Sequence, residues 1–265
     1  MKNNLKKYQN QLIKDFIKNP KQMEAIMNQY RNWNEAVETA KFHKYSISNL
    51  ILANHQLHLR TGHGIELLAP YKRWNKVNRY VKKGEKAVYI LAPISKKIEE
   101  ATENEAAEYI TWFKKVPVFD LSQTDGEPIL NDNVKGISNM SFNELLQKID
   151  CEVQFENKTF TKGWTDGEKI VISSNCSDNE KIAVLFHELA HMKLHYKRNE
   201  EINRATKELE AETVSFLCCS ALGLTNEESG AYITNWYKEN ASETIKNSNH
   251  LLKCAEDILK SVGVF

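Results

Sequence analysis

The sequence predicts a mixed helix-and-sheet (α+β) protein built from two domains. Its 265 residues exceed the commonest size of a single domain and suit two. Residues 1–60 contain no glycine and one proline and carry helical spacing, whereas three short strand patterns lie between residues 87 and 121. The turn-forming residues of segment 126–138 then precede a second set of helices and strands. We therefore expect domains at 1–125 and 139–265, joined by a linker at 126–138.

The composition is that of a soluble globular protein. Apolar residues make up 41% and charged residues 27% of the chain. No run approaches the ~20 apolar residues that span a bilayer, so no membrane association is expected. The polar N-terminus has no apolar signal core, and the five cysteines form no Cys-x-x-Cys pair. These features favour a cytoplasmic protein with reduced thiols.

The net charge of +1 hides an asymmetry between the halves. Residues 1–125 hold 21 Lys and Arg against 13 Asp and Glu, a net charge of +8. Residues 126–265 hold 15 against 22, a net charge of −7. The basic half could meet a polyanion, and the acidic half is not expected to, so the two halves should have different partners.

The expected elements follow from local patterns. In the N-terminal half, Pro20 divides two helical stretches, and Tyr45–Leu59 carries apolar residues at helical spacing. The other elements expected there are a short helix at Trp74–Val81, strands at Ala87–Ala92, Tyr109–Phe113 and Val116–Leu121, and an acidic loop at Ile98–Ala107. In the C-terminal half we expect capping boxes at Ser141–Glu144 and Ser177–Glu180, strands at Cys151–Phe155 and Lys169–Ser173, a helix to about His195, and another over Glu201–Leu222.

The motif His187-Glu188-Leu189-Ala190-His191 predicts a zinc site of the metallopeptidase kind. His187 and His191 are four residues apart on a helix, so their imidazoles share one face and can each bind Zn²⁺ at about 2.0–2.1 Å. Glu188 can then act as the general base towards a metal-activated water. A chance pattern on a solvated helix is disfavoured by the strong cap and the apolar residues around the motif. The strand just before this helix, Lys169–Ile172, is a candidate edge strand for holding a substrate.

The third metal ligand is expected on the next helix. Glu208 ranks first and Glu210 second, and Glu212 shares a helix face with Glu208. Glu212 could therefore orient a ligand histidine from outside the metal's own ligand set. His195 continues the face of His191, but one straight helix rarely wraps three ligands around an ion. We interpret His195 as a helix-end residue that interacts with the helix dipole.

The metal motif also carries a family resemblance. His187 to His195, followed by Glu208-x-x-Ala211-Glu212, resembles the ImmA/IrrE-like metallopeptidases and the peptidase domain of ArdC-type antirestriction proteins. The likeness covers about residues 140–225. It implies a zincin-like fold for the C-terminal domain, and its Glu-x-x-Ala spacing favours Glu208 as the third ligand.

The N-terminal half resembles the N-terminal domain of ArdC-type proteins over about residues 25–126. The motifs that carry the likeness are Tyr45-Ser46-Ile47-Ser48-Asn49, Trp74, Val81-Lys82-Lys83-Gly84-Glu85-Lys86 and the segment Val118–Gly126. In that family the domain is associated with single-stranded DNA binding, so the resemblance implies the same partner here.

The residue pattern supports a single-stranded DNA site by a separate route. Between Tyr71 and Lys86, seven cations face one anion, Glu85, and aromatic rings are interleaved. Cations contact phosphates, and exposed rings stack on unpaired bases. The candidate residues are Lys72, Arg73, Trp74, Lys76, Arg79, Tyr80, Lys82, Lys83 and Lys86. The competing interpretation is that Trp74 and Tyr80 are core residues and the lysines solvate a helix face.

Together the two halves predict a zinc endopeptidase coupled to a domain that binds single-stranded DNA. By resemblance it would be an antirestriction protein of a conjugative or mobile element, with a protein or peptide substrate that the sequence does not identify. Two alternatives remain: a protective DNA-binding protein with a structural zinc, and a regulatory peptidase that cleaves a repressor and does not bind DNA.

Overall fold

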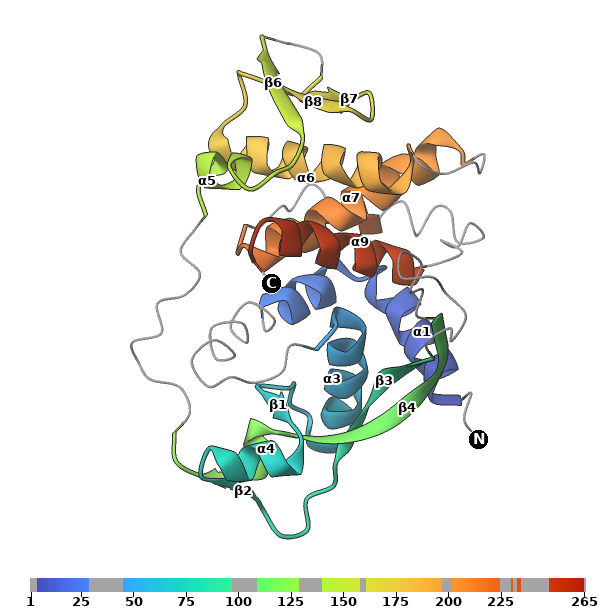
Figure 1. Ribbon diagram of the computed structural model, residues 1–265, viewed down its shortest axis with the longest axis vertical. Coiled ribbons are helices and arrows are strands. Elements are labelled where there is room, and N and C mark those ends of the chain that lie inside the picture. The colour runs from blue at the N-terminus through green and yellow to red at the C-terminus, as the bar shows by residue number, and fades with distance from the viewer. Residues whose placement is uncertain are drawn as a thin grey trace. The chain divides into compact units, whose positions relative to one another are not determined.

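A computed structural model of the chain describes residues 4–28, 45–96, 109–128, 140–157, 161–196, 202–224, 230, 233–234 and 248–264. Helices and strands are mixed throughout, as predicted (Figure 1). The expected acidic loop at Ile98–Ala107 and most of the expected linker lie outside the described residues.

Contacts divide the chain into two compact units. The N-terminal unit comprises Met1–Leu12 and Ala40–Asn131, and the C-terminal unit comprises Ile13–Thr39 and Asp132–Phe265. The segment 13–39 thus groups with the C-terminal unit, whereas the expected boundary assigned it to the first domain. Its described part buries apolar side chains such as Ile17 and Met23, and Pro20 lies beside Gly230. Helical spacing identifies such a buried face but does not identify what covers it.

The N-terminal unit is built around a long two-stranded ribbon. Its elements are α1 (Asn4–Phe16, in part), α3 (Ile47–Thr61), β1 (Leu68–Ala69), α4 (Tyr71–Lys76), β2 (Arg79–Val81), β3 (Val88–Lys96), β4 (Tyr109–Asp120), η1 (Leu121–Gln123) and β5 (Thr124–Gly126). One sheet has the antiparallel order β1-β4-β3, and β2 pairs with β5. The two strands expected at Tyr109–Phe113 and Val116–Leu121 are one strand, β4, and the expected short helix begins and ends earlier, as α4.

Two side-chain amides of α3 bond the edge of β3 that faces away from β4. Asn49 donates to the carbonyl of Leu91 over 2.9 Å and accepts from its N–H over 2.9 Å. Gln56 makes the same pair of bonds to Tyr89, over 2.8 and 3.0 Å. Asn49 and Gln56 are two helical turns apart, so they lie on one face of α3. The helix thereby satisfies backbone groups that a neighbouring strand would otherwise bond.

These bonds also explain how β4 accommodates a proline. Pro117 lies opposite Tyr89, whose N–H and carbonyl point to Gln56 rather than to β4. No N–H is therefore needed at this position of β4 for pairing with β3. Strand β1 pairs with Phe119 and Asp120 only, so it does not need one either.

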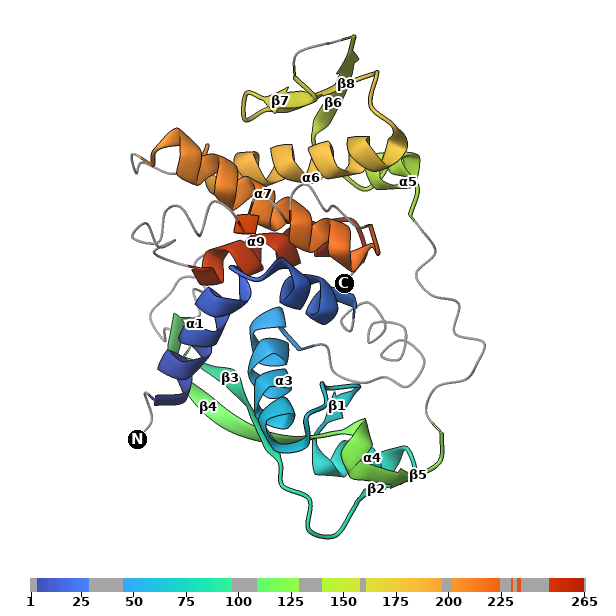
Figure 2. The ribbon, with the colours of Figure 1, turned by 180° about the vertical axis from the view of Figure 1, so that it is seen from behind.

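The C-terminal unit places a small sheet on one side of the helix α6. Its elements are α5 (Phe142–Leu146), β6 (Glu152–Glu156), β7 (Gly163–Thr165), β8 (Lys169–Ser173), α6 (Asp178–Leu194), α7 (Arg204–Ala221) and α9 (Ser248–Ser261). Figures 1 and 2 show the sheet on one side of α6 and the helices α7 and α9 on the other. The capping boxes predicted at Ser141 and Ser177 are both present and begin α5 and α6.

The order of this sheet corrects one expectation. The strands run β6-β8-β7, with β6 parallel and β7 antiparallel to β8. The strand at Lys169–Ile172 belongs to β8, which is central and bonded on both sides, so it offers no edge for a substrate. Strand β7 lies at an edge of this sheet and packs against α6.

In the part of the chain that the structure describes, no helix is long and apolar enough to cross a lipid bilayer. All five cysteines are free, and Cys151 is the one that is not buried.

Candidate metal centre

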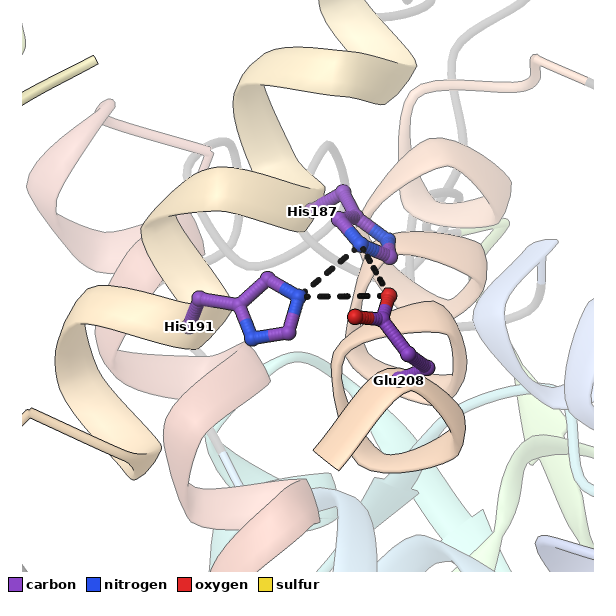
Figure 3. Close-up of side chains that lie close together, drawn as sticks. All are labelled: His187, His191 and Glu208. Carbon is purple, nitrogen blue, oxygen red and sulfur yellow. Dashed lines mark hydrogen bonds and ion pairs between the residues drawn. The ribbon is translucent and has the colours of Figure 1, made fainter. Parts of the chain in front are cut away.

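Two helices bring the metal-ligand candidates together. The capping box of Ser177 and Glu180 begins α6, which then presents His187 and His191 one turn apart. Asn203 caps α7 by accepting from the N–H of Thr206, and Glu208 lies on the second turn of that helix. Figure 3 shows both imidazoles and the Glu208 carboxylate converging between the two helices.

The geometry of this triangle suits a single divalent ion. The two Nε2 atoms are 3.0 Å apart, and Oε2 of Glu208 lies 3.4 Å from His187 Nε2 and 3.6 Å from His191 Nε2. A tetrahedral ion with bonds of about 2.0–2.1 Å holds its ligand atoms roughly 3.3–3.4 Å apart. The three observed distances bracket that value. Two nitrogens and one carboxylate oxygen also leave a fourth position open, as in catalytic zinc sites.

Glu212 lies behind His187, on the side away from the triangle. Its Oε2 is 3.0 Å from His187 Nδ1. When Nε2 faces a cation, Nδ1 carries the proton and donates it to this carboxylate, which fixes the ring orientation. This is the position expected of the orienting carboxylate.

The charges around the triangle favour a cation. Burial lowers the pKa of His187, but the Glu208 and Glu212 carboxylates outweigh it and raise this pKa to about 9. The bond to His187 lowers the pKa of Glu208 to about 2. The ring of His187 therefore lies between the carboxylates of Glu208 and Glu212, and both favour a positive charge there. A bound divalent cation would supply that charge in place of the proton.

Glu188 lies on the adjacent face of α6 and is buried, with 7% of its surface exposed. Burial raises its pKa to about 7, against the lowering effect of His187. A bound divalent cation would lower this pKa and favour the ionised carboxylate, which is the form that accepts a proton. Gly163 of β7 packs beside it: a Cβ there would lie 3.4 Å from Glu188 Oε1.

An open cleft of about 1630 Å³ surrounds these groups. It is lined by β7, α6 and α7 and includes the triangle, Glu188 and Tyr196. Tyr196 is half exposed, and its hydroxyl donates to the carbonyl of Thr165. The cleft thus places an edge strand, the Glu188 carboxylate and the candidate metal ligands along one surface.

Glu210, the second-ranked third ligand, does not point at the triangle. Its Oε2 lies 3.1 Å from His195 Nε2, and its Oε1 lies 3.3 Å from His250 Nε2. Nδ1 of His195 is in turn 2.9 Å from Nδ1 of His191. His195 is therefore a buried partner of a ligand candidate, in addition to ending α6. No short-range pattern in the sequence identifies His250, which α9 supplies from forty residues beyond Glu210.

The structure corrects one of the predicted DNA-binding residues. Trp74 is fully buried, and its indole donates to the carbonyl of Phe119 over 3.1 Å. Its ring has no face available for a base, so the core interpretation holds for this residue. Arg79 is half-buried and bonds Thr124 and the carbonyls of Gly126 and Glu127.

The remaining predicted DNA-binding residues are accessible. Tyr80 is 59% exposed, and Arg73 is half-buried. The exposed cations are Lys72, Lys76, Lys82, Lys83 and Lys86. Tyr71, which lies at the start of the same stretch, is 53% exposed and offers a second ring.

The segment Val118–Gly126 holds in place the turn Lys82–Lys86, which we call the basic turn. Asp120 is fully buried and accepts from the N–H groups of Glu66 and Leu67 and from Ser122. Gln123 donates to the carbonyl of Lys86 over 2.9 Å and to Glu85 over 2.8 Å. This segment therefore supports the turn that carries Lys82, Lys83 and Lys86.

Family models match both halves of the chain, and they group segment 13–39 with the N-terminal half, as the expected boundary does and unlike the division by contacts. Residues 3–119 match the N-terminal domain of the anti-restriction factor ArdC, and residues 149–228 match the IrrE N-terminal-like domain of peptidase family M78. The protein pXO2-81 of Bacillus anthracis is 27% identical over 252 residues, covering 75% of this chain. This chain spans 42% of that relative's length.

Two crystal structures of the antirestriction ArdC protein from plasmid R388 are similar to this chain. The Mn(II)-bound form is 18% identical with a TM-score of 0.51, covering 88% of this chain and 91% of that one. The metal-free form is 20% identical with a TM-score of 0.48, covering 83% of each chain. The Mn(II)-bound form indicates a shared fold.

The fold and the site define a metallopeptidase-like domain, with a group of side chains that could hold a divalent metal, joined to a second, mixed α+β domain. The chain carries the ArdC N-terminal domain and the IrrE-like domain of peptidase family M78 in one polypeptide, which is the two-domain layout of ArdC.

Proposed function

We propose that this protein is a zinc-dependent endopeptidase coupled to a domain that binds single-stranded DNA. The observation that carries the proposal is the triangle of His187, His191 and Glu208 with the buried Glu188 beside it in an open cleft. The ArdC likeness of residues 3–119 supports a role in antirestriction on a mobile element and a cytoplasmic location.

The chain's own groups account for a peptide hydrolysis. His187, His191 and Glu208 would hold Zn²⁺, which when bound acidifies a water molecule and polarises the scissile carbonyl. Glu188 accepts the proton of the attacking water and passes it to the leaving amine nitrogen. Glu212 keeps His187 oriented throughout.

Strand β7 provides a binding surface for an extended substrate. It lies at the edge of the sheet and lines the cleft with α6. A peptide that pairs with this edge would run past Glu188, because Gly163 of β7 packs beside that carboxylate. Backbone pairing gives affinity with little dependence on the substrate's sequence, which suits a protease of unfolded or extended segments.

The exposed part of the basic stretch supports the DNA-binding role. Tyr71 of α4 and Tyr80 of β2 present rings, and Lys82, Lys83 and Lys86 present charges on a turn that Gln123 bonds. Stacking and phosphate contacts of this kind read little sequence, so we expect binding without base preference.

Replacement of Glu188 tests the peptidase assignment. Glu188→Ala should lower the cleavage of a library of fluorescence-quenched peptides by about 10²–10⁴-fold, because the general base is lost. Zinc content and DNA binding should be unchanged, since Glu188 is not in the triangle. Glu168→Ala, which removes an exposed carboxylate of the same unit, is the matched control. Undiminished cleavage by Glu188→Ala would rule out Glu188 as the base.

A further inference from the structure

A row of buried polar groups continues behind His191, away from the metal side. Nδ1 of His191 lies 2.9 Å from Nδ1 of His195, and Nε2 of His195 lies 3.1 Å from Oε2 of Glu210. The side chains of His195 and Glu210 are 3% and 5% exposed. His191 lies on α6, His195 is the residue that ends this helix, and Glu210 lies on α7. His250 of α9 approaches the second oxygen of Glu210 at 3.3 Å.

The chemistry of imidazole fixes the direction of these hydrogen bonds once a cation is bound. A neutral imidazole has one N–H, so His191 with Nε2 on the metal must carry its proton on Nδ1. That N–H can be satisfied only if Nδ1 of His195 is an acceptor. His195 then carries its own proton on Nε2 and donates it to the Glu210 carboxylate. The whole row is satisfied in a single arrangement of protons.

We propose that His195 and Glu210 form a positioning relay for the metal ligand His191, in which the His195 ring connects the ligand to a buried carboxylate that cannot reach it directly. The proposal rests on the metal site of the proposed function. Nδ1 of His187 lies 3.0 Å from its carboxylate partner, Glu212, whereas His191 is connected to Glu210 only through the ring of His195.

The layout of α7 explains why one ligand needs the intermediate ring. Glu208 and Glu212 are one turn apart and share the face of α7 that meets the triangle. Glu210 lies between them in sequence and so projects from a different face. From there its oxygens meet His195 and His250 rather than His191. The relay also connects α9 to the metal site, because His250 approaches the same carboxylate.

The decisive experiment compares two substitutions of similar size at position 195 in the full chain. In His195→Asn, the amide oxygen stands close to the place of the lost Nδ1 and can still accept from His191. In His195→Leu there is no acceptor. Zinc affinity is measured by competition with a chromophoric chelator, and the melting temperature of the metal-free protein is recorded for each variant. We expect His195→Leu to lose about 10–100-fold in zinc affinity and His195→Asn to retain most of it.

Further variants separate positioning from packing. Glu210→Gln should weaken zinc binding less than His195→Leu, because a neutral amide oxygen still accepts from His195. Glu212→Gln provides the benchmark for losing the charge behind a ligand histidine. Asp257→Asn, which changes a half-buried carboxylate of α9 that pairs with Lys253, should bind zinc as the wild type does. The Co²⁺-loaded protein should show an altered visible absorption spectrum in His195→Leu, because the His191 ring is no longer held in one orientation.

The outcomes are distinguishable. If His195→Leu binds zinc as tightly as the wild type does, the relay is overturned. If His195→Asn and His195→Leu lose zinc affinity equally and in step with their melting temperatures, the row is a packing feature and the relay is again overturned. If the wild-type protein itself fails to bind Zn²⁺, the proposed function fails before the relay is reached.

Discussion

At the scale of single residues, polar side chains in this protein form hydrogen bonds to main-chain groups that other main-chain groups would otherwise bond. Asn49 and Gln56 bond the edge of β3, and Asp120 gathers N–H groups from two segments. Asn49 belongs to one of the motifs shared with ArdC-type domains, and the structure gives it a role in the fold. Tyr45 of the same motif is 7% exposed, and burial raises its pKa to about 12.

Replacement of Asn49 should destabilise the N-terminal unit. Asn49→Ala leaves the N–H and the carbonyl of Leu91 without their partners, which costs about 1–3 kcal/mol of unfolding free energy. Asn49→Asp should cost more, because a carboxylate cannot donate to that carbonyl. Urea unfolding of the full chain measures both, with the exposed Asn75→Ala as control. Equal stability of Asn49→Ala and the wild type would contradict the role assigned to this amide.

At the scale of elements, the N-terminus of α6 should respond to acid. Bonds from Ser177 and Lys162 lower the pKa of Glu180 to about 2, from an ordinary value of 4.5. A carboxylate with a lowered folded-state pKa stabilises the fold above its unfolded pKa and loses this effect as the pH falls towards the folded value. The wild type should therefore exceed Glu180→Gln in unfolding free energy by the largest margin above about pH 5. This margin should disappear as the pH falls from 4.5 to 2. Thermal unfolding across that range checks it, and a gap that stays constant with pH would contradict it.

The packing of β7 against α6 should depend on a missing side chain. A Cβ at Gly163 would lie 2.4 Å from Cγ1 of Val184 and 3.0 Å from the carbonyl oxygen of Val171. Gly163→Ala should therefore push β7 away from Glu188 and reduce cleavage more than zinc affinity. Gly163→Ala combined with Val184→Ala should recover part of the activity, because the second change removes the nearest clash. Peptide cleavage rates at saturating zinc measure this, and an unaltered rate in Gly163→Ala would show that β7 has no part in the reaction.

Local sequence patterns predicted most of the helices and strands, whereas the contacts between elements distant in sequence were harder to predict. The capping boxes at Ser141 and Ser177 are present because each depends on residues three positions apart. No strand was predicted at Gly163–Thr165, and the sheet edge was predicted at Lys169–Ile172 instead, because strand order depends on pairing across the sheet. The same reason applies to the metal site: the spacing of His187 and His191 is local, whereas Glu210 meets His195 and His250 through the packing of α6, α7 and α9. Trp74 was wrongly predicted to contact DNA, because an aromatic residue between cations gives the same sequence pattern whether its ring is buried or exposed.

At the scale of the whole molecule, DNA binding should belong to the N-terminal unit and be independent of the peptidase site. Fluorescence anisotropy of a labelled single-stranded oligonucleotide, with duplex as competitor, should show salt-sensitive binding that prefers the single strand. The logarithm of the binding constant falls linearly with the logarithm of the salt concentration. The double change Lys82→Ala and Lys83→Ala should make this slope shallower by about 1.4, since each phosphate contact contributes about 0.7. Tyr80→Ala should weaken the binding free energy for the single strand by about 1–3 kcal/mol, because a stacking ring is lost.

The controls for this measurement lie in the other unit. Lys253→Ala removes an exposed cation from α9, and Glu188→Ala removes the proposed base, so neither should alter the affinity. The absence of binding at low salt would reduce the basic turn to a solvated surface and leave a peptidase whose partner is a protein.

The bonding of β3 by α3 has a consequence for how the sequence can drift over generations. Asn49 and Gln56 contact main-chain atoms of Tyr89 and Leu91, and main-chain atoms are the same whatever residues β3 carries. Selection should therefore hold the two amides while leaving the exposed side chain of Tyr89 comparatively free to change. Among natural variants of this domain, we expect the helix to be the more constant of the two elements, and a loss of the amide at one position should be accompanied by a change in how the edge of the strand is covered.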